Sequence, residues 1–157
     1  MRLLIVATLA GVLSLAACQQ PVEFDPDDPE TIAAIEAVLS EAMEGARNVD
    51  ADRVLAAAEG EGELTLITGD VMLGGVDYIR ETFRQTYDGL EGQDQTVLAS
   101  RVRVLSPDVA IVIAVSEGTY TDKAGWTSDP VGMGHTLVLV RESGEWRIRH
   151  AHQSIAP

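Results

Sequence analysis

The chain has 157 residues and carries 25 acidic against 11 basic side chains, giving a formal net charge of −14. Such a chain repels polyanions, so nucleic acid is excluded as a partner. The single cysteine excludes an internal disulfide and a cysteine-based metal site. The acidic residues are spread along the sequence, which is typical of a solubilising surface rather than of a cation-binding site.

The first seventeen residues predict export from the cytoplasm. Arg2 precedes an apolar run over residues 3–15 that is too short to span a bilayer and is typical of a signal peptide. The run ends in Leu-Ala-Ala-Cys at 15–18, which resembles the bacterial lipobox, whose cysteine is acylated and becomes the first residue of the mature chain. We therefore expect residues 1–17 to be removed and Cys18 to anchor the protein to the lipid bilayer.

Residues 18–28 predict a tether between the lipid and one folded domain. Two prolines and several acidic residues favour an extended conformation with a reach of roughly 30 Å. Gln19 stands where an aspartate would resemble the inner-membrane retention signal, so the resemblance favours an outer-membrane protein that faces the periplasm. The remaining residues, 29–157, suit one domain with a hydrophobic core.

Helical periodicity dominates the first half of the domain. Asp28 and Pro29 are typical of a helix start, and apolar residues then recur at helical spacing as far as Ala46. A shorter helix is predicted from Asp50 to Ala58, before a glycine-rich stretch. A short strand is predicted at 64–68, and a third helix carries Val76, Ile79, Phe83 and Tyr87 on one face and ends near Gly89.

The second half predicts four long strands in two hairpins. The first hairpin turns at Ser106-Pro107-Asp108 and the second at Ser143-Gly144, and a loop that carries Trp126 connects them. The predicted strands cover residues 95–106, 109–120, 134–142 and 145–155, with the loop at 121–134. Helices followed by antiparallel strands indicate an α+β fold, in which the helices cover one face of a curved sheet.

This order of elements, the length and the closing segment Gly144-Glu145-Trp146-Arg147-Ile148 … His152-Gln153-Ser154 resemble the nuclear transport factor two-like superfamily, in particular its SnoaL-like branch. The resemblance covers about residues 29–155. It implies a cone-shaped barrel made by a curved mixed, mainly antiparallel sheet, with three N-terminal helices on its concave face and a pocket inside. Relatives with this fold include isomerases and cyclases, proteins that only bind, and dimers formed through the outer sheet face, so the fold alone implies no reaction.

The last predicted strand places two histidines on an alternating row. Trp146, Ile148, His150, His152 and Ser154 occupy every second position, and the apolar members predict that this row faces inward. We therefore expect His150 and His152 to line the pocket, about 7 Å apart at Cβ. The further pocket candidates are Trp146, Ser154, Tyr78, Phe83 and Tyr120.

A zinc site needs a third ligand, and His135 is the only other histidine. A two-residue Ser143-Gly144 turn places His135 opposite His152, whereas a three-residue loop turns His135 to the other face. Serine is unfavourable at the first position of the primed turns, which favours the three-residue loop. We therefore predict no metal, and the sequence shows no fingerprint of a cofactor.

Three functions remain open. The first is non-catalytic binding of a small, partly apolar molecule in the cone. The second is an isomerase, cyclase or hydratase in which His152 or His150 acts as acid or base, with Asp70 or Glu63 orienting it and Tyr120 or Tyr78 as donor. The third is an interaction module, a homodimer formed through the outer sheet face, with side chains filling the cone. We expect the first, because buried strand histidines are more often structural than catalytic.

Overall fold

A computed structural model describes residues 24–156 as three helices, one short 3₁₀ turn and a six-stranded sheet. The predicted signal peptide and Cys18 lie outside the described residues. None of the helices in the described part of the chain is long and apolar enough to span a membrane. In chain order the elements are α1 Pro29–Arg47, α2 Ala51–Leu55, η1 Ala56–Ala58, β1 Thr65–Thr68, β2 Val71–Gly74, α3 Val76–Tyr87, β3 Leu90–Ser106, β4 Val109–Asp122, β5 Val131–Glu142 and β6 Glu145–Ile155.

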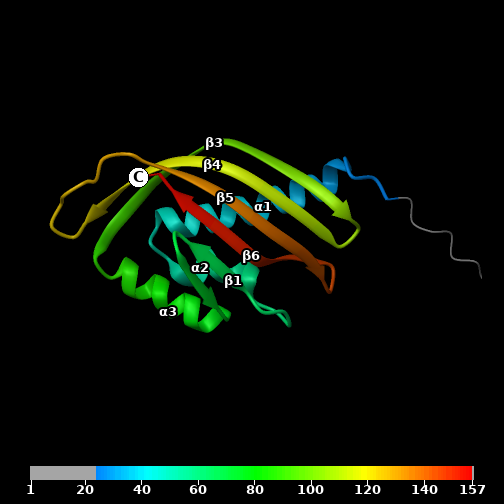
Figure 1. The fold of residues 1–157 in the computed structure, drawn as a ribbon, viewed down its shortest axis with the longest axis horizontal. Coiled ribbons are helices and arrows are strands. Elements are labelled where there is room, and N and C mark those ends of the chain that lie inside the picture. The colour runs from blue at the N-terminus through cyan, green and yellow to red at the C-terminus, as the bar shows by residue number, and fades with distance from the viewer. Residues whose placement is uncertain (1–23, 157) are drawn as a thin grey trace, which may run out of the picture.

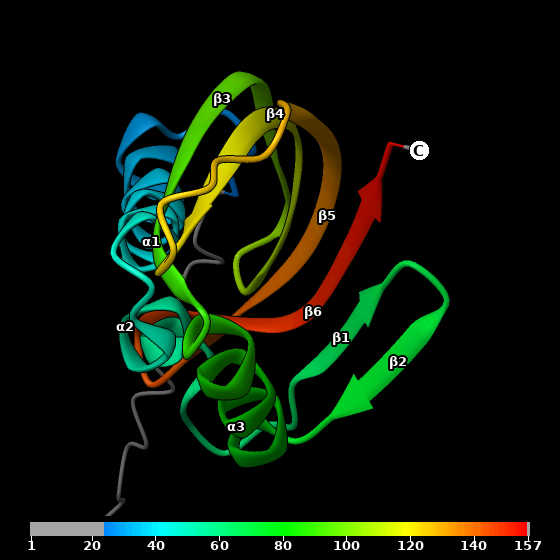
Figure 2. The same cartoon turned by 90° about the vertical axis from the view of Figure 1, so that its left-hand side faces the viewer.

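The sheet is curved and the helices lie along its concave face, as predicted (Figures 1 and 2). Its strand order is β2-β1-β6-β5-β4-β3. Within it β1 and β6 are parallel and the other neighbouring strands are antiparallel. Figure 2 shows the cone end on, with α1 beside β3 and β4, α2 at the lower left and α3 below β6.

The helices begin where the sequence predicted. The Asp28 carboxylate accepts a hydrogen bond from the Thr31 backbone N–H at 2.9 Å, which caps α1. The Asp50 carboxylate caps α2 in the same way, through the Arg53 backbone N–H at 3.0 Å. Each cap satisfies an N–H group that the first turn of a helix leaves without an intrahelical partner. Strand β2 was not predicted, because its four residues include one glycine and only Gly75 separates them from the helix that follows.

The two ends of the sheet differ in character. The hairpin end carries the turns β3–β4 and β5–β6, and the loop end carries residues 123–130, the β1–β2 turn and the C-terminal end of β6 (Figure 1). The core fills the hairpin half and the centre of the concave face. Its buried members include Ile35, Leu55, Leu66, Ile79, Val104, Ala110, Val112, Leu139, Trp146 and Ile148.

The β5–β6 turn has two residues, so the predicted three-residue loop is wrong. Glu142 pairs with Glu145, and both Ser143 (φ 52°) and Gly144 (φ 89°) have left-handed backbone conformations. Two such residues are typical of a type I′ turn, whose twist matches that of the flanking strands. The fit of the hairpin therefore outweighs the poor preference of serine for a positive φ.

A β-bulge at Arg149 shifts the register of the last strand. Leu139 pairs with Ile148 but Val138 pairs with His150, so β6 contains one extra residue at this point. Paired residues share a face, and a bulge of one residue exchanges the faces of all residues that follow. Ala151, which packs with Leu137 against the core, therefore occupies the inner face that the alternation had assigned to the histidines.

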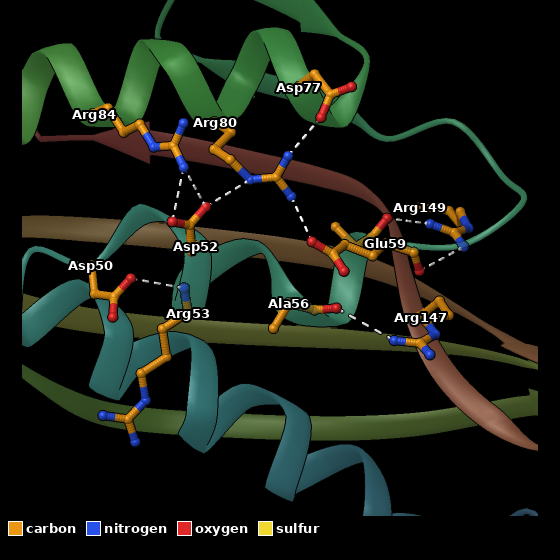
Figure 3. Close-up of polar contacts among 11 residues, drawn as sticks. Asp50, Asp52, Arg53, Ala56, Glu59, Asp77, Arg80, Arg84, Arg147 and Arg149 are labelled. Atoms are coloured by element: carbon orange, nitrogen blue, oxygen red, sulfur yellow. Dashed lines mark hydrogen bonds and ion pairs between the residues drawn. The ribbon is translucent and has the colours of Figure 1, made fainter.

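Arg149 is held at the bulge by partners from other elements. Its side chain is 10% exposed, pairs with Glu142, and donates to the Ala58 carbonyl oxygen at 2.7 Å. It also donates to the Glu59 carbonyl oxygen, as Figure 3 shows. The Arg149 guanidinium lowers the pKa of the Glu142 carboxyl below its usual value by hydrogen bonding. The bulge thus depends on contacts with the 3₁₀ turn, which no local pattern in β6 reveals.

A second group of ion pairs connects α3 to α2 and to Glu59, the residue that follows η1 (Figure 3). The Arg80 side chain is 14% exposed and contacts Asp52 at 3.0 Å, Glu59 at 2.7 Å and Asp77 at 2.6 Å. Arg84 donates to the same Asp52 carboxylate at 2.8 Å, which lowers the Asp52 pKa. Together these contacts fix the helices that form the floor of the cone.

Candidate functional site

The predicted histidine pair lies on the outer face of the sheet. His150 pairs with Val138, and His152 pairs with Thr136, residues that alternate with the core residues Leu137 and Leu139. The prediction that these histidines share the inward face of Trp146 and Ile148 is therefore wrong, and the bulge is the reason. Ser154 pairs with Gly134 on the same outer face and is exposed.

The remaining sequence candidates are dispersed. Trp146 is a core residue, and its indole N–H has no partner among the described residues. Phe83 packs against the core, whereas Tyr78 is exposed on α3. Asp70 is exposed in the β1–β2 turn and Glu63 is exposed beside Gly74. Tyr120 lies at the loop end with its ring 5.7 Å from that of Trp126.

The concave face instead carries His135, which alternates with Leu137 and Leu139 on β5. Its imidazole Nε2 lies 2.8 Å from the Ser116 hydroxyl on β4. Ser116 is 2% exposed and alternates with the core residues Ala110 and Val112. The alternation on β5 would have revealed this position from the sequence if the two-residue turn and the bulge had been known.

Polar side chains extend from His135 across four neighbouring strands. Gln153 pairs directly with His135, Thr68 pairs with Gln153, and Ser116 pairs with Met133. The Thr68 hydroxyl lies 3.5 Å from the Gln153 amide oxygen, and the Gln153 amide nitrogen lies 3.1 Å from the Met133 sulfur. We call Thr68, Gln153, Met133, His135 and Ser116 the polar band. Directly paired side chains have Cβ atoms about 4.5–5.5 Å apart, so the band is continuous.

The concave face remains accessible beside the polar band. Three apolar residues on the inner rows are substantially exposed: Val97 by 42%, Tyr120 by 39% and Ile155 by 52%. Two surface depressions lie elsewhere on the described part of the chain. One of about 370 Å³ is lined by residues 99–101 and 113–115, and one of about 460 Å³ by Pro26, Asp27 and residues 101–105.

Burial lowers the pKa of His135 below its usual 6.5. The folded protein then binds fewer protons at this site than the unfolded chain, so stability falls as the pH drops from about 6.5 toward the native pKa. We expect His135→Gln to weaken this fall. Urea unfolding of both proteins at several pH values between about 7.5 and 5.5 measures the difference, and identical pH dependences would contradict the assignment.

Burial also raises the pKa of Tyr87, whose ring lies 5.6 Å from that of Phe83, to about 12. The folded state keeps the phenol neutral, so its contribution to stability is present below the usual pKa of 10.0 and is lost as the pH rises toward 12. A spectroscopic alkaline titration should show a late tyrosinate transition that Tyr87→Phe removes. A transition that survives in this variant would contradict the assignment.

No group of three or more histidine, cysteine, aspartate or glutamate residues in the described part of the chain is arranged to hold a metal ion. The three histidines do not converge, because His135 lies on the inner face and His150 and His152 lie on the outer face. The band can therefore offer hydrogen bonds and one imidazole to a ligand, surrounded by apolar strand residues.

Comparison with known proteins places this geometry in a family. A protein-family model described as "SnoaL-like domain" matches residues 35–157. No curated protein sequence matches significantly. Among solved structures, a ketosteroid isomerase-like protein from Erwinia carotovora atroseptica is 24% identical with a TM-score of 0.68, covering 82% of this chain and 99% of its own.

Two further structures share the fold at low sequence identity. A protein of the NTF2-like family from Streptomyces avermitilis has a TM-score of 0.71 at 12% identity, covering 82% of this chain and 97% of its own. The association domain of CaMKII from C. elegans has a TM-score of 0.66 at 18% identity, covering 83% of this chain and 99% of its own. The chain shares the fold of these proteins, and it belongs to the SnoaL-like domain family.

Proposed function

We propose that the protein binds a small, partly apolar molecule at the loop end of its concave face, without catalysis. The observation that carries this proposal is the polar band, in which a half-buried His135 stands among apolar strand residues. Ligand sites of this class are mostly apolar, with a few polar groups that fix the orientation of the ligand. The exposed inner residues Val97, Tyr120 and Ile155 supply the apolar part.

Thermal unfolding in the presence of a panel of small uncharged aromatic and alicyclic compounds tests the proposal. A ligand that binds only the folded state raises Tm, by an amount that grows with its concentration above Kd. We expect at least one class of compound to raise Tm for the wild type and for His152→Ala, a variant of the outer face. His135→Ala should lose this increase, and an equal increase in both variants would contradict the proposal.

The enzyme alternative, as the sequence suggested it, relied on His150 or His152 as the acid or base. A general acid or base must come within hydrogen-bond reach of the reacting group. His150 and His152 point away from the concave face, and Asp70 is exposed in a turn. The ketosteroid isomerase-like neighbour shares the fold but is 24% identical, so its name alone supports no reaction here.

We also propose that the protein is lipid-anchored through Cys18 in the outer membrane and faces the periplasm. In the described residues, Pro26 and Asp27 lie against β3 at the hairpin end, opposite the loop end that carries the polar band (Figure 1). A tether attached there directs the band away from the anchor. Metabolic labelling with a palmitate analogue tests the anchor: label should enter the wild type and not Cys18→Ala, and label in both would contradict it.

Homodimerisation through the outer sheet face is a second candidate function. Ile113 and Val115 are neighbours on this face of β4, and they are 49% and 46% exposed. Both help to line the depression of about 370 Å³. Exposed apolar patches of this kind mark interaction sites, and one structural neighbour is an association domain. Sedimentation should show a dimer that Ile113→Asp dissociates, and a wild-type monomer at all concentrations would reject this candidate.

A further inference from the structure

The hydrogen bond between Ser116 and His135 restricts where the imidazole proton resides. Ser116 is 2% exposed, so its hydroxyl proton needs an acceptor inside the protein. The His135 Nε2, at 2.8 Å, is the partner of this hydroxyl among the described residues. If Nε2 carried the proton and donated it to Ser116, the serine proton would be buried without an acceptor.

The geometry points to the opposite arrangement: Ser116 donates to Nε2, and His135 presents an Nδ1–H donor to a carbonyl oxygen of an uncharged, mainly apolar ligand on the concave face. This inference rests on the proposed binding function and names the chemistry of its ligand. No described group forms a hydrogen bond with Nδ1, and the imidazole is only half-buried. A neutral imidazole with one nitrogen already satisfied offers one donor in a fixed direction.

Gln153 adds a second neutral donor beside His135. The two residues pair directly across β5 and β6. The Gln153 amide nitrogen contacts the Met133 sulfur at 3.1 Å, and thioether sulfur is a weak acceptor. Each amide nitrogen carries two hydrogens, so a hydrogen on Gln153 remains available to a stronger acceptor such as a carbonyl oxygen.

The charges around the band favour an uncharged ligand over a carboxylate. The five residues of the band include no lysine and no arginine. Two cationic side chains at this end of the molecule are engaged by other groups: Arg47 by Glu44 and the Gln95 carbonyl oxygen, and Lys123 by Asp88. The whole chain has a formal net charge of −14, which repels an approaching anion. A carbonyl oxygen needs donors but no counter-charge, and the band provides such donors.

The position of the proton is measured directly by nitrogen-15 nuclear magnetic resonance of the imidazole rings in the purified wild-type protein near neutral pH. Chemical shifts and long-range couplings distinguish the two neutral tautomers. We expect His135 to carry its proton on Nδ1, and Ser116→Ala to remove this preference. A wild-type His135 with its proton on Nε2 overturns the inference, whether or not any variant folds.

The ligand class is tested by calorimetry with three probes that share one ring: acetophenone, ethylbenzene and benzoate. We expect acetophenone to bind at least about tenfold more tightly than either of the others, and this preference to persist in the outer-face control His152→Ala. Equal binding of acetophenone and ethylbenzene overturns the inference but leaves the binding function intact. Tighter binding of benzoate overturns it too. Failure of all three probes to bind also overturns the inference, whereas the proposed binding function fails only if no compound of the thermal-unfolding panel raises Tm.

Discussion

Leu139→Ala should destabilise the protein by about 2–5 kcal/mol, the range for truncating a fully buried leucine. Leu139 is 0% exposed and lies at the centre of the concave face, paired with Ala110 on β4 and with Ile148 on β6. Its truncation leaves a cavity that the rigid strands on both sides cannot fill. Urea unfolding measures the loss, with the neighbouring outer-face residue as control.

Val138 provides that control because it precedes Leu139 on the same strand but faces outward. It is half-buried, so Val138→Ala should cost clearly less than the truncation of Leu139. Equal losses in the two variants would contradict the assignment of faces on β5. Because His135 lies on the same face as Leu139, equal losses would also contradict the placement of His135 on the concave face.

Gly45→Ala should destabilise the protein by about 1–3 kcal/mol, although alanine is the better helix former by roughly 1 kcal/mol. A Cβ atom at this position of α1 would lie 2.6 Å from the Val54 backbone nitrogen and 2.9 Å from the Arg53 carbonyl carbon. Both atoms belong to the backbone of α2, so the helices must separate. The glycine allows the close approach of α1 and α2 that builds the floor of the cone.

The matched control is Gly89→Ala, where no heavy atom lies within 4 Å of the added Cβ. The free energy of unfolding of this variant should lie within about 0.5 kcal/mol of the wild-type value, as expected for a surface substitution away from special features. Stabilisation by Gly45→Ala would show that α1 and α2 do not pack as described.

The sequence predicted the larger elements because their signals are local. Asp28 and Asp50 cap helices whose apolar spacing is clear, and the bounds of β6 at Glu145 and Ile155 agree with the predicted strand. Buried Trp146 and Ile148 confirm the inward face of the first half of that strand. Such signals arise from a few neighbouring residues, so one sequence reveals them.

The candidate site was predicted poorly because its geometry depends on distant contacts. The bulge at Arg149 is held by Glu142 and by carbonyl groups of η1, far away in the sequence, and it exchanges the faces of His150 and His152. The predicted orientation of His135 away from His152 agrees with the structure, but for a different reason. The turn and the bulge each shift the register by one residue relative to the prediction, so the combined shift of two again places His135 and His152 on opposite faces. The faces themselves are exchanged: His135 points inward, where the sequence predicted His152, and the predicted outward orientation of His135 is wrong.

The central claim is that ligands bind at the concave face around His135 rather than at the outer histidines. The most direct test is to titrate the wild-type protein with acetophenone and to follow the imidazole resonances of all three histidines by nuclear magnetic resonance. We predict saturable shifts for His135 and for the side-chain amide of Gln153, with His150 and His152 unchanged. Shifts confined to His150 and His152 would contradict the claim and place the binding surface on the outer face of the sheet.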